Sequence, residues 1–392
     1  MRRITKLSLI ASLALSSSLY AESISDAFAN TKFKGEIKTE YANSNFLGNT
    51  DSDSIWAVGG NLNAVTGEFY GISAGATLQS SSIINDNNNN GVFAADLDAS
   101  GAALSEAYLE YKTSNTSFKA GRQYITTPLI STSVETKSSE TLLRDSFEAY
   151  VLTNTDIPET TVIAGYVDKW QGNTDGSGDI GDFSNSTLED GAYTIYAKNN
   201  SIENLTLQAQ YVKVDSSTDT NDRSATYLQA DYNVSGHTVS AQFLSSEIND
   251  EDAKLFGLKS TGPLGYGKLG YVVAYNTTTT DHSGFQYLGE GRGVSDTPFT
   301  ALPVHGGGVP VRGETDTLVG ALVIPTSVAT IIPYAGKSFE DSGFLGDVVG
   351  LGVMAIAPIN KNLLLQVKYE NVDVEALPEK TDTARIYLSY KF

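Results

Sequence analysis

Ala384-Arg385-Ile386-Tyr387-Leu388-Ser389-Tyr390-Lys391-Phe392 ends the chain, and in this stretch apolar or aromatic residues alternate with mostly polar ones. Successive side chains of a β-strand point to opposite faces, so alanine, isoleucine, leucine, Tyr390 and Phe392 share one face. Arginine, serine and lysine share the other face, together with Tyr387. One face suits lipid and the other suits water, as in a membrane-spanning β-barrel. A soluble edge strand shows the same alternation but seldom ends a chain on an aromatic residue. We therefore predict a closing barrel strand whose assembly signal is Tyr390 and Phe392.

An apolar segment near the start of the chain has the features of an export signal. Three basic residues precede an uncharged apolar run over 7–19, and small or polar residues follow it. The run is shorter than the ~20 apolar residues of a spanning helix, so cleavage after Ala21 is expected. Residues 1–21 then form a cleaved signal peptide, and residues 22–392 form a single barrel domain in the bacterial outer membrane.

Composition narrows the class of protein. The 392 residues include 36 glycines, 21 tyrosines and 10 prolines, and no apolar stretch after the leader is long enough to span a membrane as a helix. A spanning chain of this kind must cross as strands. Cysteine is absent, which excludes disulfides and thiolate metal sites, and the net charge of -20 argues against nucleic acid as a partner. No cofactor is expected.

Alternation recurs along the chain in segments of barrel-strand length, ~9–11 residues. The clearest segment covers residues 33–41, where four charged residues share one face and are expected to face the lumen: Lys34, Glu36, Lys38 and Glu40. The other segments with this pattern are 54–65, 68–80, 103–113, 116–124, 147–154, 160–169, 192–198, 205–214, 224–232, 238–245, 254–260, 267–275, 318–323, 330–337, 348–356, 363–372 and 384–392. The fold class is therefore an all-β, antiparallel transmembrane barrel of about eighteen strands, with sixteen as the next choice.

Connections between these segments differ in length. Tight turns are marked by Thr66-Gly67, Ser114-Asn115 and Gly236, whereas four connections are long: 81–102, 125–146, 170–191 and 276–317. Short turns are typical of the periplasmic side of a barrel and long loops of the extracellular side. Aromatic residues gather near the segment ends, which is typical of the two interfacial girdles of a membrane barrel.

Two of the long connections carry both signs of charge and are candidates for a pore constriction. The first, together with the end of the preceding strand, contains Arg122, Glu135, Lys137, Glu140, Arg144 and Asp145. The second contains Arg292, Asp296, His305, Arg312 and Glu314, together with three prolines that restrict its extension. Opposed charges on an infolded loop create a transverse field that sorts solutes in a pore. Solvated surface loops are the alternative.

In the first of these connections and its flanking strands, the sequence resembles the OprD-type outer-membrane porins. The resemblance rests on Ala120-Gly121-Arg122-Gln123-Tyr124-Ile125-Thr126-Thr127-Pro128-Leu129 and on Thr141-Leu142-Leu143-Arg144-Asp145-Ser146-Phe147-Glu148-Ala149-Tyr150-Val151-Leu152-Thr153-Asn154. Residues 25–28 and 35–38 are similar to the first strand of that family, and the terminal phenylalanine also matches. The resemblance implies eighteen strands and a water-filled pore for passive diffusion of small hydrophilic solutes and ions. It also implies that the third loop and the seventh, here 276–317, fold inward.

The preferred sign of the permeating ion depends on residues that differ from the family pattern. Members of the family often pass small carboxylates along inward basic residues, but only six arginines follow the leader. Glu135-Thr136-Lys137 stands where the family commonly has Asp-Thr-Arg, so the bidentate guanidinium is missing. With the acidic excess, we predict a weakly cation-preferring general pore. A channel selective for small carboxylates or amino acids is the alternative.

Two other classes of site find little support in the residues. Asp86, Asn88 and Asn90 match the opening of a calcium loop, but its twelfth position is Leu97 and no glutamate closes it. A barrel enzyme such as a phospholipase needs a nucleophile and a base, yet no Gly-x-Ser-x-Gly elbow is present, and the three histidines are far apart. We therefore expect neither a metal site nor catalysis. The expected partners are outer-membrane lipid, the permeating solutes and the barrel-assembly machinery, and a homotrimer is an open alternative to a monomer.

Overall fold

The structure is a computed structural model that describes residues 23–45, 51–87, 90–94, 96–184, 188, 190–215, 222–248, 251–279, 287–306, 313–341 and 345–392. The predicted signal peptide therefore lies outside the described residues. The elements are α1 (Ile24–Ala29), β1 (Lys32–Ser44), β2 (Asp53–Val65), β3 (Ile72–Asn87), β4 (Ala99–Thr113), β5 (Thr116–Gln123), β6 (Ser146–Asn154), β7 (Thr160–Gln171), β8 (Gly178–Asp179), β9 (Ala192–Asn199), β10 (Leu205–Val214), β11 (Arg223–Val234), β12 (His237–Ile248), β13 (Glu251–Pro263), β14 (Gly270–Thr278), η2 (Arg292–Asp296), β15 (Thr315–Pro325), β16 (Thr330–Glu340), β17 (Val348–Pro358), β18 (Leu363–Val374) and β19 (Thr381–Lys391).

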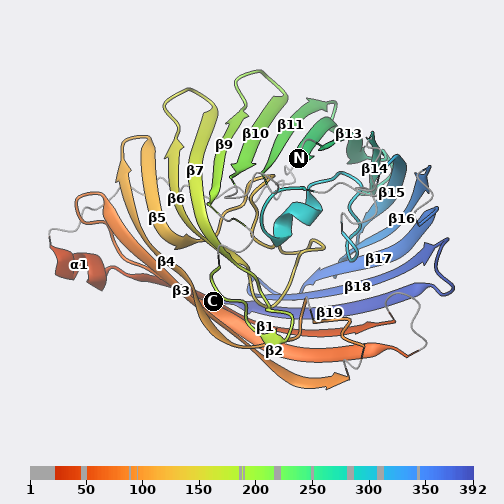
Figure 1. Cartoon of the computed structure of the whole chain (residues 1–392), viewed down its shortest axis with the longest axis horizontal. Coiled ribbons are helices and arrows are strands. Elements are labelled where there is room, and N and C mark those ends of the chain that lie inside the picture. Colours follow the sequence, from red (N-terminus) through yellow and green to blue (C-terminus); the bar gives the residue numbers. More distant parts are fainter. Residues whose placement is uncertain are drawn as a thin grey trace.

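The strands close into one antiparallel barrel, shown in Figure 1. Strand β1 pairs with β2 on one side and with β19 on the other, so the sheet has no free edge. The two-residue strand β8 stands outside this ring, because β7 pairs directly with β9 while β8 pairs in parallel with β4. The ring within the described residues therefore has eighteen strands, which confirms the predicted number. Several strands extend beyond their predicted limits. For example, β3 continues to Asn87 and shortens the loop expected at 81–102.

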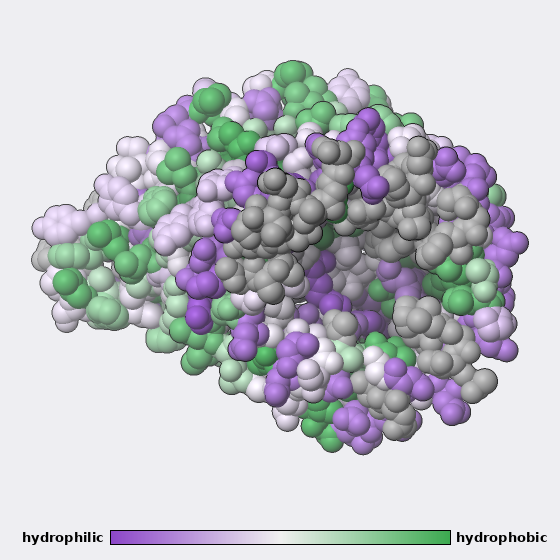
Figure 2. All heavy atoms as spheres, in the orientation of Figure 1, coloured by the Kyte–Doolittle hydropathy of each residue, from purple (hydrophilic) through white to green (hydrophobic). Residues whose placement is uncertain are grey.

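Side chains alternate between the two sides of the wall as the sequence predicts. In β1, Phe33 and Ile37 are 64% and 56% exposed on the outer side, whereas Lys38 and Glu40 are buried on the inner side. Alternation of this kind places an apolar surface outside and a polar surface inside. Hydrophobic residues accordingly lie over the outer wall in Figure 2, and hydrophilic residues line the hollow in the middle of that view.

Among the residues that the structure describes, no helix is long and apolar enough to cross a membrane.

The two ends of the barrel differ in the length of their connections. The end that holds the start of β1 and the end of β19 carries eight turns of two to six residues: 66–71, 114–115, 155–159, 200–204, 235–236, 264–269, 326–329 and 359–362. We call this end the short-turn rim. The opposite end carries the long connections, including 124–145 and 279–314. This asymmetry confirms the predicted alternation of short and long connections.

The closure of the barrel depends on a contact between its first and last strands. The amide of Gly35 donates to the carbonyl oxygen of Phe392 at 2.9 Å, and the amide of Phe392 donates to the carbonyl oxygen of Gly35 at 3.0 Å. A Cβ atom on Gly35 would lie 2.3 Å from the ring of Phe392. Only glycine leaves room for this ring, so the terminal residue completes the β1–β19 ladder and covers it on the outer side.

Candidate pore constriction

Residues 124–145, which we call the inner loop, fold into the barrel against the inner faces of β1, β18 and β19. Lys38 donates to Glu140 at 2.9 Å, and Gln366 donates to the same carboxylate at 2.6 Å. Lys368 lies 3.4 Å from it as well and donates to the backbone oxygen of Lys137 at 2.7 Å. One loop carboxylate is therefore shared by two wall lysines. Burial raises the pKa of Glu140, but the two lysines outweigh that effect and lower its pKa to about 2.

The start of the inner loop packs on a different part of the wall. The amide of Leu129 donates to the side-chain oxygen of Gln210 on β10 at 2.8 Å, and the amide nitrogen of Gln210 donates to Thr127 at 2.8 Å. The apolar residues of this contact are fully buried: Leu129, Ile130, Phe147, Val212, Leu244 and Leu255. The inner loop therefore reaches from the β10–β13 wall to the β1–β19 wall and crosses the lumen.

Residues 287–306, which we call the strap, form a second crossing. The strap is held near its start at Glu290, which accepts from Arg223 on β11 at 2.9 Å. It ends at His305, where the carboxylate of Glu370 on β18 accepts from the imidazole at 2.5 Å and from the backbone amides of Val304 and His305 at 3.2 and 3.1 Å. Tyr334 on β16 donates to the same carboxylate at 2.7 Å. A buried carboxylate that accepts several hydrogen bonds holds a loop end firmly.

The strap is also fixed by an apolar contact with the wall. Leu302 is 4% exposed and fits into a notch left by Gly336 and Gly350 on β16 and β17. A Cβ atom on Gly350 would lie 2.5 Å from the side chain of Leu302. These glycines are therefore needed because the strap approaches the strands so closely.

The inner loop and the strap bind each other. Asp296 of the strap accepts from the backbone amide and hydroxyl of Ser138 at 2.9 and 2.6 Å, and from the hydroxyl of Ser139 at 2.5 Å. Asp145 of the inner loop accepts from the backbone amides of Ser133 and Arg292 at 2.6 and 2.9 Å. Burial raises the pKa of Asp145, although these amides oppose the shift. The two segments thus form one structural unit inside the barrel.

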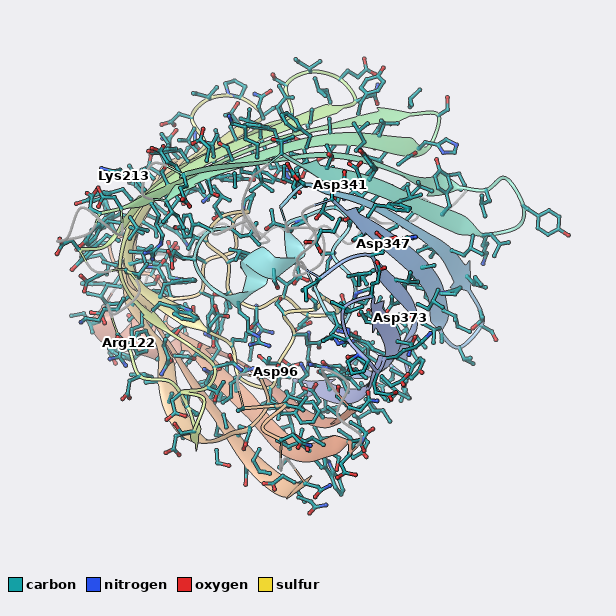
Figure 3. The ribbon with its side chains drawn as sticks, turned by 45° about the vertical axis from the view of Figure 1, so that its right-hand side comes forward. Asp96, Arg122, Lys213, Asp341, Asp347 and Asp373 are labelled. Atoms are coloured by element: carbon teal, nitrogen blue, oxygen red, sulfur yellow. The ribbon has the colours of Figure 1, made fainter. Side chains whose placement is uncertain are left out.

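A third connection joins this unit through charged groups. Asp96, between β3 and β4, lies 2.7 Å from Arg292 of the strap and also pairs with Arg385 on β19. Figure 3 shows Asp96 inside the ring of strands. The two arginines lower the pKa of this carboxyl group, although burial opposes them. Glu40 is fully buried beside Arg385, at 3.8 Å.

Most of the predicted constriction residues take part in this unit. Arg144 pairs with Glu135 at 2.5 Å and with Glu36 at 3.6 Å, and Lys391 at the end of β19 reaches Glu135 at 2.6 Å. The contacts described above place five more predicted residues in the same unit: Glu140, Asp145, Arg292, Asp296 and His305. Lys34 shares the inner face of β1 but is exposed near the short-turn rim. Arg312 lies outside the described residues.

Two of the predictions are wrong. Arg122 lies on β5 next to Glu148 on β6, on the same side of the wall as the exposed Phe118 and Tyr150. Figure 3 shows it on the outer side of the barrel. Sequence reasoning grouped it with the loop because it is close in the chain, but strand parity turns it away from the lumen. Glu314 is exposed directly before β15 and is not part of the buried strap.

The weak calcium candidate is also not assembled. Asn88 lies outside the described residues, and Asp86 is exposed near the end of β3. The side chain and backbone amide of Asn90 donate instead to Asp53 at 2.9 and 3.0 Å. In the described part of the chain, no group of three or more metal-binding side chains is found.

Several residues of the site were missed from the sequence. Lys368 and Glu370 alternate with apolar residues in the predicted strand 363–372, so their parity would have placed them on the inner wall. Asp96, Glu290 and Leu302 lie in connections without periodicity, and no sequence signal indicated that they face the lumen.

Among the described residues, two lysines of the constriction form no ion pair with a carboxylate. Lys259 on the inner face of β13 lies 4.0 Å from the ring centre of Phe299 in the strap. Its charge is repelled by Lys137 of the inner loop and attracted by Asp231 on β11. Within the described residues, no ion pair joins either lysine to a carboxylate. Two cations that form no ion pair among the described residues attract anions into this part of the lumen.

Comparisons with known proteins agree with this architecture. No family model matches the chain, and no curated protein matches its sequence. Among solved structures, OccK8 (OprE) of Pseudomonas aeruginosa has 15% sequence identity and a TM-score of 0.72, with 93% of this chain and 99% of that one covered. OccAB1 of Acinetobacter baumannii has 14% identity and a TM-score of 0.74, with 96% and 99% covered. OccAB2 of the same organism has 15% identity and a TM-score of 0.74, with 94% and 99% covered.

The fold and the infolded segments define a class of structure, the closed eighteen-stranded antiparallel β-barrel. More particularly, the chain has the fold of the Occ and OprD-type channels, which confirms the fold that the sequence resemblance implied.

Proposed function

We propose that the protein is an outer-membrane porin through which small hydrophilic solutes and ions diffuse passively. The observation that carries this proposal is a closed barrel crossed by two interlocked, charged segments, the inner loop and the strap. A barrel of this size without infolded segments leaves a wide aqueous channel, and the two crossings narrow it. No step of this function requires a cofactor or a chemical reaction.

The proposed selectivity is a weak preference for cations. Carboxylates of the barrel interior are largely matched by basic partners, as at Glu140 and Asp96, so the acidic excess lies elsewhere. Asp341 is exposed at the long-loop mouth (Figure 3), where Asp347 and Asp373 lie as well but pair with Lys337 and Lys380 at 2.9 Å. Carboxylates at a mouth raise the local concentration of cations.

A channel selective for small carboxylates is the second candidate, and Lys137 and Lys259 favour it. Within the described part of the chain neither lysine of the constriction forms an ion pair, whereas the acidic mouth lies farther along the path. Two lysine cations beside the ion path favour the passage of anions over that of cations.

The zero-current potential across a salt gradient decides between the two candidates. The purified protein is inserted into a planar bilayer, and the potential is measured with potassium chloride on both sides at different concentrations. Discrete conductance steps with a cation-directed potential support the proposed selectivity, and an anion-directed potential supports the carboxylate channel. A folded, heat-modifiable barrel that gives no conductance steps would contradict the channel function.

Catalysis is the rival class of function, and we propose that the protein lacks it. A barrel phospholipase needs a histidine base beside a nucleophile. His237 instead bonds to the hydroxyl of Tyr271 at 2.9 Å, and His305 holds Glu370. His282 lies outside the described residues. Incubation of the folded barrel with labelled phospholipid tests this proposal, and released fatty acid would contradict it.

A further inference from the structure

The connection between β3 and β4 enters the barrel just inside the long-loop mouth. We call the described residues of 90–98 the mouth segment. Its side chains Phe93 and Leu97 are 1% and 3% exposed and belong to one buried apolar cluster with Ala42 and Ile55. Ala42 lies near the end of β1 and Ile55 near the start of β2, where the long connections begin. The mouth segment is therefore packed on the inner wall at this end of the barrel.

Asp96 of the mouth segment, which lies inside the ring of strands in Figure 3, bridges two arginines. Nη2 of Arg292 in the strap donates to one oxygen of its carboxylate at 2.7 Å, and Nη2 of Arg385 on β19 donates to the other oxygen. Each arginine thus offers one nitrogen to Asp96, although a guanidinium group can form two parallel hydrogen bonds with an oxyanion. The carboxylate therefore occupies a site that has more donors than it uses.

Arg385 in particular has donor capacity left. Its Nε atom is buried, and no hydrogen bond to it is found among the described residues. A buried donor without an acceptor is costly to the folded state. A tetrahedral oxyanion presents more oxygen atoms than a carboxylate and can accept from both guanidinium groups at once. The unfilled donor therefore favours such an oxyanion as the ligand of the arginine pair.

The balance of charge around Arg385 favours an anion of twofold charge. Ion pairs and the pairing of β18 with β19 bring four cations and three carboxylates together, which leaves a net charge of +1: Arg292, Arg385, Lys38, Lys368, Asp96, Glu40 and Glu140. A monoanion in place of Asp96 leaves this charge unchanged, whereas a dianion brings it to zero. Glu40, 3.8 Å from Arg385, repels an anion at this point, and the lysines of β1 and β18 offset that repulsion.

The contacts of the mouth segment are separate from those that join the inner loop to the strap. Its backbone is held by the connection between β7 and β9, where Thr174 donates to the carbonyl oxygens of Ala94 and Asp98 at 3.0 and 3.2 Å. The inner loop and the strap are joined through Asp145 and Asp296, by hydrogen bonds in which the mouth segment has no part. An anion that displaces the aspartate carboxylate from the arginines therefore leaves the two crossings joined.

We infer that Arg292 and Arg385 form a binding site for a small tetrahedral dianion of the sulfate and hydrogen phosphate class, and that Asp96 covers this site until the anion displaces it. The inference rests on the proposed function, because the ion reaches the arginines through the lumen. With Asp96 in place both guanidinium charges are screened, which agrees with a weak preference for cations in potassium chloride. Displacement moves the mouth segment away from the arginines and exposes them to the lumen.

Hydrogen exchange of the wild-type protein tests the displacement. The purified, folded barrel is incubated in sodium sulfate or in sodium chloride at equal ionic strength, and exchange of the backbone amides of residues 90–98 is measured. We expect exchange to be about threefold faster in sulfate, because the displaced segment opens more often. Sulfate strengthens apolar burial in general, so its unspecific effect is slower exchange. Residues 124–145 are the internal reference and should not accelerate.

Binding of sulfate to variants tests the site itself. In isothermal titration calorimetry, Asp96→Asn should bind sulfate about tenfold more tightly than the wild type, because the wild-type site is uncovered in only a fraction of the molecules. Its mouth segment should exchange fast in both salts. Asp96→Glu should behave like the wild type, and so should the matched control Asp86→Asn, whose carboxylate is exposed near the end of β3. Arg385→Gln added to Asp96→Asn should abolish the tight binding.

Two results would overturn the inference. One is unchanged exchange of the mouth segment in sulfate, because Asp96 would then be a permanent link between the arginines. The other is equal affinity of Asp96→Asn and the wild type for sulfate. Neither readout depends on conductance. A barrel that binds sulfate but gives no conductance steps contradicts the channel function and supports the site, whereas conductance steps without sulfate binding contradict only the site.

Discussion

At the scale of single residues, the position of the inner loop depends on Glu140. Its carboxylate is buried between Lys38 and Lys368, and removing one partner of a buried ion pair costs about 3–5 kcal/mol, because the remaining charges stay buried and unpaired. We therefore expect Glu140→Gln to loosen the inner loop and to produce larger and noisier single-channel conductance. The control is Glu135→Gln, whose carboxylate is more exposed and for which we expect a smaller change. Equal effects of the two substitutions would contradict the central role of Glu140.

The same carboxylate gives the docking of the inner loop a defined dependence on pH. The pKa of Glu140 falls from its ordinary value of 4.5 to about 2 in the folded protein. A lowered pKa means that the pairing contributes fully above pH 4.5 and is lost as the pH falls toward 2. We expect constant conductance from neutral pH to about 4.5 and increasing fluctuations below it. In Glu140→Gln, the channel should fluctuate at neutral pH and lose this transition; a transition of the same size in both proteins would contradict the assignment.

A prediction for the strap also depends on one position. Gly350→Ala places a methyl group where Leu302 packs, so the end of the strap must move. Overpacking of this kind costs typically about 1–3 kcal/mol. We expect higher conductance and easier proteolysis between residues 287 and 306. Gly320→Ala on β15 is the matched control, because a Cβ atom there meets nothing within 4 Å. Unchanged conductance and proteolysis in Gly350→Ala would show that Leu302 does not fix the strap.

At the scale of elements, the strands were predictable and the infolded segments were only partly so. Period-two alternation located β1 and β19 and assigned their faces, because a lipid-facing surface and a water-facing surface impose opposite chemistry on neighbouring residues. Loops have no such period. The charges of the inner loop were recognised, but the wall lysines that bind Glu140 and the notch that receives Leu302 result from contacts between distant parts of the chain. Arg122 was wrongly assigned to the constriction, because its proximity to the inner loop in the sequence was given more weight than its parity on the strand.

The closing pair of strands provides a prediction at this scale. Phe392 completes the β1–β19 ladder and covers Gly35, and we also propose that it is recognised by the barrel-assembly machinery. Deletion of Phe392 and the substitution Gly35→Val should both reduce the heat-modifiable, folded fraction in the outer membrane. Phe392→Tyr keeps the ring and should assemble normally. If only the deletion impairs assembly, the contact with Gly35 is dispensable and recognition by the machinery accounts for the effect.

At the scale of the whole molecule, net charge and pore charge are separate quantities. The chain carries -20, yet wall and loop charges inside the barrel pair with each other, as Lys38 does with Glu140 and Arg292 with Asp96. Composition therefore predicts the potential around the protein better than the potential at its narrowest point. Lys137 and Lys259 are two groups at the constriction for which no ion pair is found among the described residues, so they bear most directly on the charge that a permeating ion meets there.

This difference leads to a prediction for ion selectivity. From the sequence, Arg144 and Lys137 would be the residues to substitute in a test of ion selectivity. Arg144 pairs with Glu135 and Glu36, however, so its removal also leaves two carboxylates without this partner. The double substitution Lys137→Gln and Lys259→Gln breaks no ion pair among the described residues. One charge at ~4 Å in water is worth about 1 kcal/mol, which is about a fivefold change in local ion partitioning. We expect the zero-current potential to shift toward cations by that order, and by little in Lys361→Gln, whose lysine lies in a short turn. An unchanged potential in the double variant would place both lysines away from the ion path and leave the acidic mouth as the determinant of selectivity.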